Sequence, residues 1–192
     1  FRAEQLDEAL RRGVAPLYFI HGDEPLLVQE AADAVRAAAR AQGYGEREVM
    51  EAGSGFDWEG LRHLSANLSL FAQRRLIDLR LPGGKPGQVG AKALAELAAR
   101  PPADTLVLIT SSRLDKATAA AAWAKALERH GVSVPVWPIP SERLAGWLAA
   151  RMRARGMRLE AGAAALIAAR TEGNLLAAAQ ERFARAGQRR QG

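Results

Sequence analysis

The sequence predicts an α/β protein: a parallel five-stranded sheet flanked by helices, followed by a small domain of three helices. Up to Pro135, short apolar runs alternate with amphipathic helical patterns, which is typical of βαβ units and a parallel sheet. The alternation stops at the proline-rich run 135–140, and only helical patterns follow it. We therefore place an α/β domain at 1–140 and a helical domain at 141–192.

Five segments have the character of strands. The first and fourth are continuous apolar runs, which indicates strands that are buried on both faces. The third alternates between apolar and polar residues, and the second has the weakest strand pattern of the five. In chain order, the predicted strands are 16–20, 47–50, 75–81, 105–110 and 132–137.

Helical periodicity fills the connections between these strands. In the second of them, Trp58, Leu61 and Leu64 share one helical face. The glycine- and proline-rich run 82–90 predicts a loop. In chain order, the predicted helices of the first domain are 25–42, 57–67, 91–99 and 115–129.

The second domain is predicted from a change of pattern. Three prolines within 135–140 make a stiff, extended connector. Gly156 and Gly173 lie where helix ends or turns are expected. The predicted helices of this domain are 141–155, 160–169 and one from 175 onward.

The net charge of +6 is unevenly distributed along the chain. Residues 1–140 contain 17 basic and 17 acidic side chains, whereas residues 141–192 contain ten arginines and four glutamates and hold the whole excess. A neutral body followed by a basic segment suggests a polyanionic partner for the second domain. An arginine-rich genome explains the pattern equally well, because 23 of the 27 basic residues are arginine.

The composition excludes several classes of protein. With 48% hydrophobic and 25% charged residues, the chain resembles an ordinary globular protein. It has no cysteine, which excludes thiol nucleophiles and zinc ribbons and fits a reducing compartment. No apolar run reaches the ~18 residues of a membrane helix. Because the chain starts at Phe1 rather than at a methionine, we expect it to come from a longer protein.

The turn after the first strand is where a sheet of this kind would bind nucleotide phosphates. A Walker loop there needs glycines, a lysine and a Ser or Thr, so that backbone amides and the lysine surround the phosphates. This chain instead has Asp23 and Glu24, whose carboxylates would repel a triphosphate and complement the helix dipole themselves. The sequence therefore predicts a capped helix starting at Pro25 and no ATPase.

The sequence contains no other catalytic or metal-binding pattern. The glycine-rich run 83–87 lacks a Ser or Thr after its lysine, and the strand 105–110 ends without an acidic pair. The histidines lack the spacing of metal ligands and are expected at the surface or at the edge of the core: His21, His63 and His130. We expect no active site, no cofactor and no metal.

Leu70 and Phe71 leave two interpretations open. They lie between a predicted helix and the strand at 75–81. In regular structure, consecutive side chains point in different directions, but in a loop both can project outward as an apolar wedge that fits a partner's pocket. From the residues alone, closure of the core at the helix end is the more common explanation.

Five ordered segments give the chain a family resemblance. They are 16–27 (PLYFIHGDEPLL), 69–72 (SLFA), 106–109 (LVLI), 113–116 (RLDK) and 172–177 (EGNLLA). Their order and spacing, over nearly all of residues 1–181, resemble the delta subunit of the bacterial DNA polymerase III clamp loader.

This resemblance implies a fold, a role and a set of partners. The fold would be an AAA+-like domain, a three-helix lid and a third, collar domain that this chain lacks. The role would be that of a cytoplasmic, noncatalytic subunit of the replicative polymerase that opens the sliding clamp (the beta subunit) for loading onto primed DNA. Further implied partners are the ATPase and delta-prime subunits of the loader. The residues that match the family's clamp contacts are Leu68, Ser69, Leu70 and Phe71, which favours the exposed wedge.

Four arginines within eight residues predict a basic face that approaches DNA in the assembled loader: Arg151, Arg153, Arg155 and Arg158. A solubilising helix surface is an equal alternative.

Two rival functions also stay open, namely a nucleic-acid-binding adaptor without a clamp partner and a degenerate nucleotide enzyme. DNA affinity without clamp affinity would indicate the first, and ATP binding would indicate the second.

Overall fold

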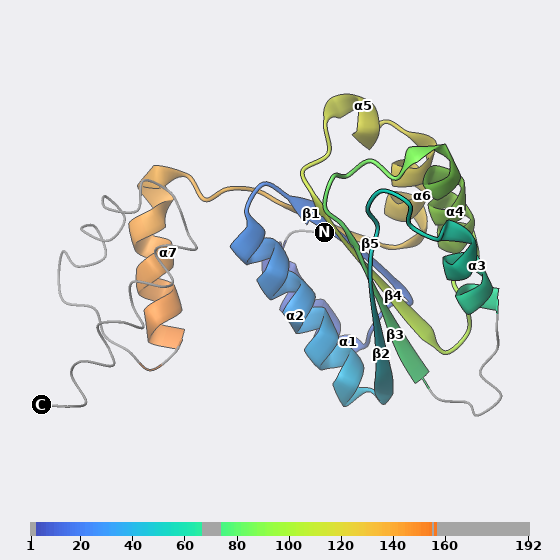
Figure 1. Ribbon diagram of the computed structural model, residues 1–192. Coiled ribbons are helices and arrows are strands. Elements are labelled where there is room, and N and C mark those ends of the chain that lie inside the picture. Colours follow the sequence, from blue (N-terminus) through green and yellow to red (C-terminus); the bar gives the residue numbers. More distant parts are fainter. Residues whose placement is uncertain (1–2, 67–73, 155, 157–192) are drawn as a thin grey trace, which may run out of the picture. The chain divides into compact units, whose positions relative to one another are not determined.

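The computed structural model describes residues 3–66, 74–154 and 156. The chain divides into two compact units, Phe1–Val136 and Trp137–Gly192, each of which is described by itself. Figure 1 shows the sheet and its helices in the first unit. Within the described residues, no helix has the length and apolar character needed to cross a membrane.

A parallel sheet of five strands forms the centre of the first unit. Its strands are β1 (Leu17–Gly22), β2 (Tyr44–Glu51), β3 (Arg74–Leu81), β4 (Thr105–Ser112) and β5 (Val132–Val136). They lie in the order β2-β3-β4-β1-β5, and all four pairings are parallel. The predicted fold class, a five-stranded parallel sheet with helices between the strands, is thus confirmed.

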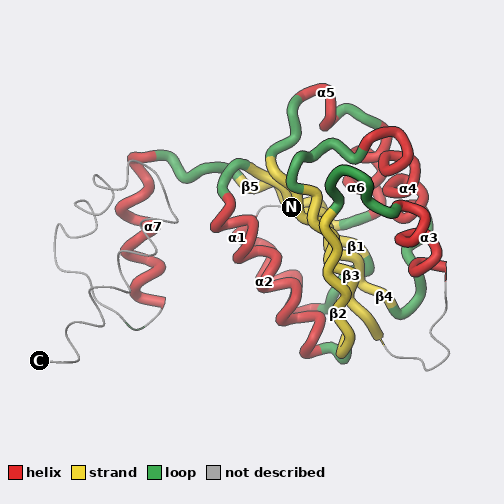
Figure 2. The backbone as a smooth tube through the Cα atoms, viewed as in Figure 1, coloured by secondary structure: helices red, strands yellow, loops and turns green. Residues whose placement is uncertain are grey.

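Helices cover both faces of the sheet, as Figure 2 shows. One face packs against α1 (Ala3–Arg12) and α2 (Pro25–Ala41), and the other packs against α3 (Trp58–Ala66), α4 (Gly87–Ala99) and α6 (Ala122–His130). Alternate residues of β1 supply the two cores: Phe19 lies in one, and Tyr18 and Ile20 lie in the other. Helix α1, which the sequence did not single out, contributes buried Leu6 and Leu10.

Helix α4 begins four residues earlier than expected. The prediction of a loop over 82–90 is wrong for residues 87–90, which belong to the helix. Gly90 is buried there, and a Cβ on it would lie 2.5 Å from the ring of Trp58. A glycine that normally signals a break is therefore required by close packing between α3 and α4.

The predicted helix at 115–129 is also wrong, because this segment forms two helices. Asp115 accepts a hydrogen bond from the backbone N–H of Thr118, at 2.7 Å, and caps the short α5 (Lys116–Ala119). The chain is then extended at Ala121, the residue before α6 begins. An alanine-rich sequence has no residue that marks such a break, so periodicity alone could not reveal it.

The second unit is described only over its first helix. Helix α7 (Ser141–Ala154) begins at Ser141, as expected, and buries Leu144, Leu148 and Met152. The helices predicted at 160–169 and from 175 onward lie outside the described residues.

Candidate functional site

A crevice lies at the carboxyl ends of β1, β3 and β4. The chain leaves β1 toward the face covered by α2 and leaves β4 toward the opposite face, so the crevice lies at a topological switch point, where parallel sheets commonly bind ligands. Its volume is about 490 Å³. We call it the switch-point crevice, and its polar lining includes Asp23, Arg36, Arg80, Thr110, Ser111 and Ser112.

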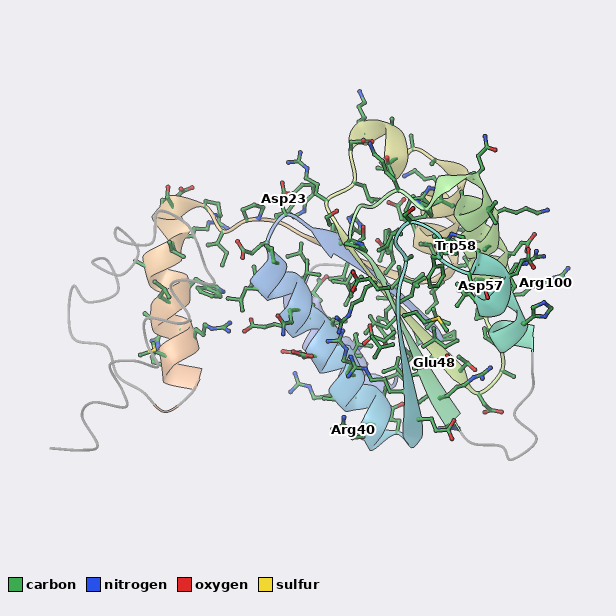
Figure 3. The ribbon with its side chains drawn as sticks, viewed as in Figure 1. Asp23, Arg40, Glu48, Asp57, Trp58 and Arg100 are labelled. Atoms are coloured by element: carbon green, nitrogen blue, oxygen red, sulfur yellow. The ribbon has the colours of Figure 1, made fainter. Side chains whose placement is uncertain are left out.

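The turn from β1 to α2 does not form a phosphate cradle. Gly22 is needed for packing, because a Cβ there would collide with the backbone carbonyl of Val136 in β5. Asp23 accepts a hydrogen bond from Arg113 Nη1 at 3.0 Å, as part of an ion pair. Figure 3 shows Asp23 in this turn, just before α2. The acidic pair therefore occupies the position at which phosphates would need positive charge.

Glu24 precedes α2 and is only 8% exposed. Burial raises the pKa of its carboxyl above the ordinary value of 4.5, and the backbone amide of Leu26 opposes this shift to a smaller extent. A carboxyl at the start of α2 adds negative charge there whenever it ionises. Helix α2 starts at Pro25, as predicted, and the absence of a nucleotide site at residues 23–24 stays a prediction.

The second glycine-rich segment is also occupied by contacts within the chain. Lys85 Nζ lies 3.7 Å from Asp115 Oδ2. Gly84 has φ +62°, and a Cβ there would lie 3.1 Å from Leu114. The loop after β3 therefore packs against the loop after β4 instead of surrounding a ligand. Among the described residues, no group of three or more His, Asp or Glu side chains could hold a metal ion.

The three histidines lie on three different elements, β1, α3 and α6. His21 stacks on Phe19 with ring centroids 4.6 Å apart, at the edge of the core. Burial lowers its pKa, and nearby Glu128 partly offsets this effect. His63 and His130 are exposed on α3 and α6. These positions match the expected surface and core-edge roles.

A buried ion cluster, which the sequence reasoning missed, lies beside the crevice. Asp78 of β3 is fully buried, and its Oδ2 accepts hydrogen bonds from Arg36 Nε at 2.8 Å and Arg47 Nη2 at 2.6 Å. Arg36 also pairs with Asp33. The cluster joins α2, β2 and β3. The only sequence signal for it was one aspartate within an otherwise apolar stretch of the strand.

The predicted clamp-contact residues, Leu68, Ser69, Leu70 and Phe71, lie outside the described residues. Their flanking elements are firmly anchored in the core: Leu61 of α3 is 1% exposed, and Leu76 of β3 is 3% exposed. A cavity of about 910 Å³ between α3 and α4 is lined by Leu61, His63 and Leu97. The assignment of clamp contacts stays a prediction.

Of the four arginines predicted to face DNA, only Arg151 and Arg153 lie in the described part of the chain. The guanidinium carbon of Arg151 lies 4.8 Å from the centroid of the Trp147 ring, one helical turn earlier in α7. Arg153 is exposed. Residues two positions apart in a helix do not face each other, so Arg151 and Arg153 point to different sides. Their role toward DNA stays a prediction.

The first unit matches one protein family over most of its length. The model of "DNA polymerase III, delta subunit" matches residues 18–136, and this match ends where the first unit ends. The chain belongs to the DNA polymerase III delta subunit family.

Relatives in the delta subunit family extend beyond this chain. The chain is 35% identical over 177 residues to DNA polymerase III subunit delta of Escherichia coli and 28% identical over 180 residues to that of Haemophilus influenzae. Each alignment covers 92% of this chain and 52% of the relative. The chain thus spans about half the length of the curated relatives it matches.

Solved structures show the same fold at low sequence identity. A Bacillus subtilis DNA clamp loader delta protein has a TM-score of 0.67 and 17% identity, over 93% of this chain and 55% of that protein. A Thermotoga maritima RuvB variant has a TM-score of 0.58 and 12% identity, over 91% of this chain and 56% of that protein. The fold is therefore shared by a delta subunit and by RuvB.

Proposed function

We propose that this chain is the clamp-binding part of a noncatalytic clamp-loader subunit. In this role it binds the sliding clamp through Leu68, Leu70 and Phe71 and helps to open the ring for loading onto primed DNA. The observation that carries the proposal is the family match over 18–136, because it includes the connection from α3 to β3 in which these residues lie.

The geometry of the switch-point crevice supports a noncatalytic role. Asp23 is held by Arg113, and buried Glu24 stands at the start of α2. Neither residue can contribute positive charge to bound phosphates. In this role, clamp binding by this subunit contributes to ring opening, and nucleotide chemistry belongs to the ATPase subunits of the loader. Those ATPase subunits and delta-prime are its proposed partners, and the proposed location is the cytoplasm.

A second candidate function is a nucleic-acid-binding adaptor. The arginine excess of residues 141–192 favours it, because phosphate contacts by arginine supply most nonspecific DNA affinity. We propose DNA contact as an accessory property of the assembled loader, with Arg151, Arg153, Arg155 and Arg158 as candidates.

Calorimetry with the purified cognate clamp and with primed DNA separates the two functions. We expect saturable clamp binding by residues 1–192 and by residues 1–140 alone, because the predicted contacts lie before the connector. DNA binding without clamp binding would favour the adaptor. Clamp binding that requires residues 141–192 would contradict the assignment to the first unit.

A further inference from the structure

Arg74 stands where the segment with the predicted clamp contacts, 67–73, joins the sheet. It is the first residue of β3, and in the register of the two strands it pairs with Tyr44, the first residue of β2. Figure 1 shows the start of β3 beside the start of β2 and the end of α2. The contacts of Arg74 therefore fix the point at which the connection from α3 reaches the sheet.

The side chain of Arg74 contacts the turn between α2 and β2 in two ways. Its Nη1 donates a hydrogen bond to the backbone carbonyl of Gln42 at 3.0 Å, and its guanidinium carbon lies 5.6 Å from the centroid of the Tyr44 ring. Gln42 ends α2, and a helix leaves its last carbonyls without partners inside the helix. A basic side chain commonly satisfies such a carbonyl. Arg74 thus ties the start of β3 to the end of a helix.

The turn that receives Arg74 is itself held in place. The backbone N–H of Gln42 donates to carbonyls of α2, and its side-chain Oε1 accepts a hydrogen bond from the backbone N–H of Val14 at 3.1 Å. Tyr44 packs against the core on the α1 and α2 side of the sheet. Arg74 is therefore bound to groups that the core keeps in position.

These contacts contribute more to position than to overall stability. Arg74 is exposed, and exposed polar contacts are weakened by water. A connection that carries a binding element gives higher affinity when it is held near its bound conformation, because ordering a segment on binding costs free energy. At its other end, α3 is anchored by buried Leu61 and by Arg62, whose Nη2 lies 2.9 Å from Glu96 of α4. Arg74 is the corresponding anchor at the β3 end.

We propose that Arg74 is a positioning residue for clamp binding, which holds the β3 end of the connection 67–73 so that Leu70 and Phe71 are presented to the clamp. This inference rests on the proposed function, because it requires that the connection bind the clamp. Arg74 acts through Gln42 and Tyr44 of its own chain and does not need to touch the clamp.

The test compares Arg74→Ala with Arg80→Ala in the chain 1–192. Arg80 lies on the same face of β3, near its other end, so each variant loses one exposed arginine from the same strand. Interferometry measures clamp affinity, and thermal melting measures stability. We expect Arg74→Ala to weaken clamp binding about fivefold or more and Arg80→Ala to change it less than about twofold, with melting temperatures near that of the parent. The loss should be equal at low and high salt, because salt screens attraction between charges but not the ordering of a segment.

Substitutions of Tyr44 test whether Arg74 acts through its own chain. Tyr44→Leu removes the ring beside Arg74 and keeps an apolar side chain toward the core. We expect it to weaken clamp binding by a smaller factor than Arg74→Ala. The double variant should lose no more affinity than Arg74→Ala alone, because the two changes break one contact. Tyr44→Phe keeps the ring and should keep the parent's affinity.

Other results would overturn this inference. Equal clamp affinities of Arg74→Ala and Arg80→Ala would show that Arg74 has no special role. The parent's affinity in Tyr44→Leu, or a loss in Arg74→Ala that high salt removes, would show that Arg74 acts by its charge on the clamp itself. If Tyr44→Leu does not fold, the salt series decides this point. A lowered melting temperature of Arg74→Ala would show that Arg74 serves the stability of the sheet.

Leu70→Ala/Phe71→Ala separates failure of this inference from failure of the proposed function. Lost affinity in that variant, together with the parent's affinity in Arg74→Ala, would overturn the inference and leave the proposed function standing. No clamp binding by the parent would contradict both.

Discussion

Asp78 joins three elements through one carboxylate. Its partners Arg36 and Arg47 lie 42 and 31 residues away along the chain, in α2 and β2. A single aspartate within an apolar strand can indicate a buried, paired carboxylate. The amino-acid sequence cannot identify the partners, however, because they lie more than 30 residues away along the chain. In contrast, the placement of Asp23 and Glu24 before α2 was predictable, because the start of a helix is set by nearby residues.

Replacing Asp78 by Ala leaves the buried Arg36 side chain, which is 15% exposed, without its main partner. We expect a loss of about 3–5 kcal/mol in the free energy of unfolding, as for other broken buried ion pairs. Asp33→Ala is the matched control, because it removes a second partner of Arg36 that is 59% exposed, and it should cost less than about 1 kcal/mol. Urea denaturation measures both. Similar losses in the two variants would contradict a structural role for the buried cluster.

Glu24 gives the protein a predictable dependence on pH. Burial raises its pKa in the folded state above 4.5, so the folded protein holds a proton more tightly than the unfolded chain. The resulting stability is present in full below pH 4.5 and is lost as the pH rises through the folded-state pKa. We expect Glu24→Gln to raise the melting temperature at pH 7 and to change it less at pH 4. Glu48→Gln, on exposed β2, controls for loss of a surface charge. A lower melting temperature of Glu24→Gln at pH 7 would contradict this account.

At the scale of elements, the sequence predicted all five strands, but not equally well. Buried apolar runs mark β1 and β4, whereas β2 is largely exposed and its pattern indicated only residues 47–50 of Tyr44–Glu51. The helices were harder to predict. The boundary between α5 and α6 lies within an alanine-rich segment, and the start of α4 lies within a glycine-rich one. At Gly90 the deciding influence is Trp58 on a different helix, which local sequence does not reveal.

Two glycines in helices should respond to alanine in opposite ways. Gly90→Ala should cost about 1–3 kcal/mol, because its Cβ would lie 2.5 Å from the Trp58 ring in a packed core. In α7, a Cβ on Gly146 would meet no atom of the described residues within 4 Å, so Gly146→Ala should stabilise the protein by about 0.4–1 kcal/mol. Thermal unfolding of both variants checks the pair. A neutral Gly90→Ala variant would show that α3 and α4 pack less closely than described.

At the scale of the whole molecule, the chain has a sheet with a switch-point crevice, and the turn from β1 to α2 carries Asp23 and Glu24. The charge of these two residues predicts that no nucleotide binds there, and this stays a prediction. The clamp contacts could not be predicted in that way. Leu70 and Phe71 fit a core as well as a wedge, and only the family resemblance favoured the wedge.

ATP with Mg²⁺ should not stabilise the chain. A ligand present at 100 times its dissociation constant stabilises the folded state by about 2.7 kcal/mol, which a melting experiment detects easily. We expect no change in melting temperature up to millimolar ATP, because Asp23 and Glu24 oppose phosphate binding. A saturable rise would contradict this interpretation of the turn between β1 and α2.

The binding of the clamp by Leu70→Ala/Phe71→Ala tests the proposed function most directly. Truncating an aromatic anchor at an interface commonly costs about 2 kcal/mol or more, or roughly thirtyfold in affinity. Loss of a core phenylalanine would instead cost about 3–5 kcal/mol of stability. Val89→Ala, at a 61% exposed apolar residue of α4, is the control. We expect the double variant to keep a melting temperature near that of the parent and to lose at least about thirtyfold in clamp affinity. A collapsed melting temperature, or an unchanged clamp affinity, would contradict the assignment.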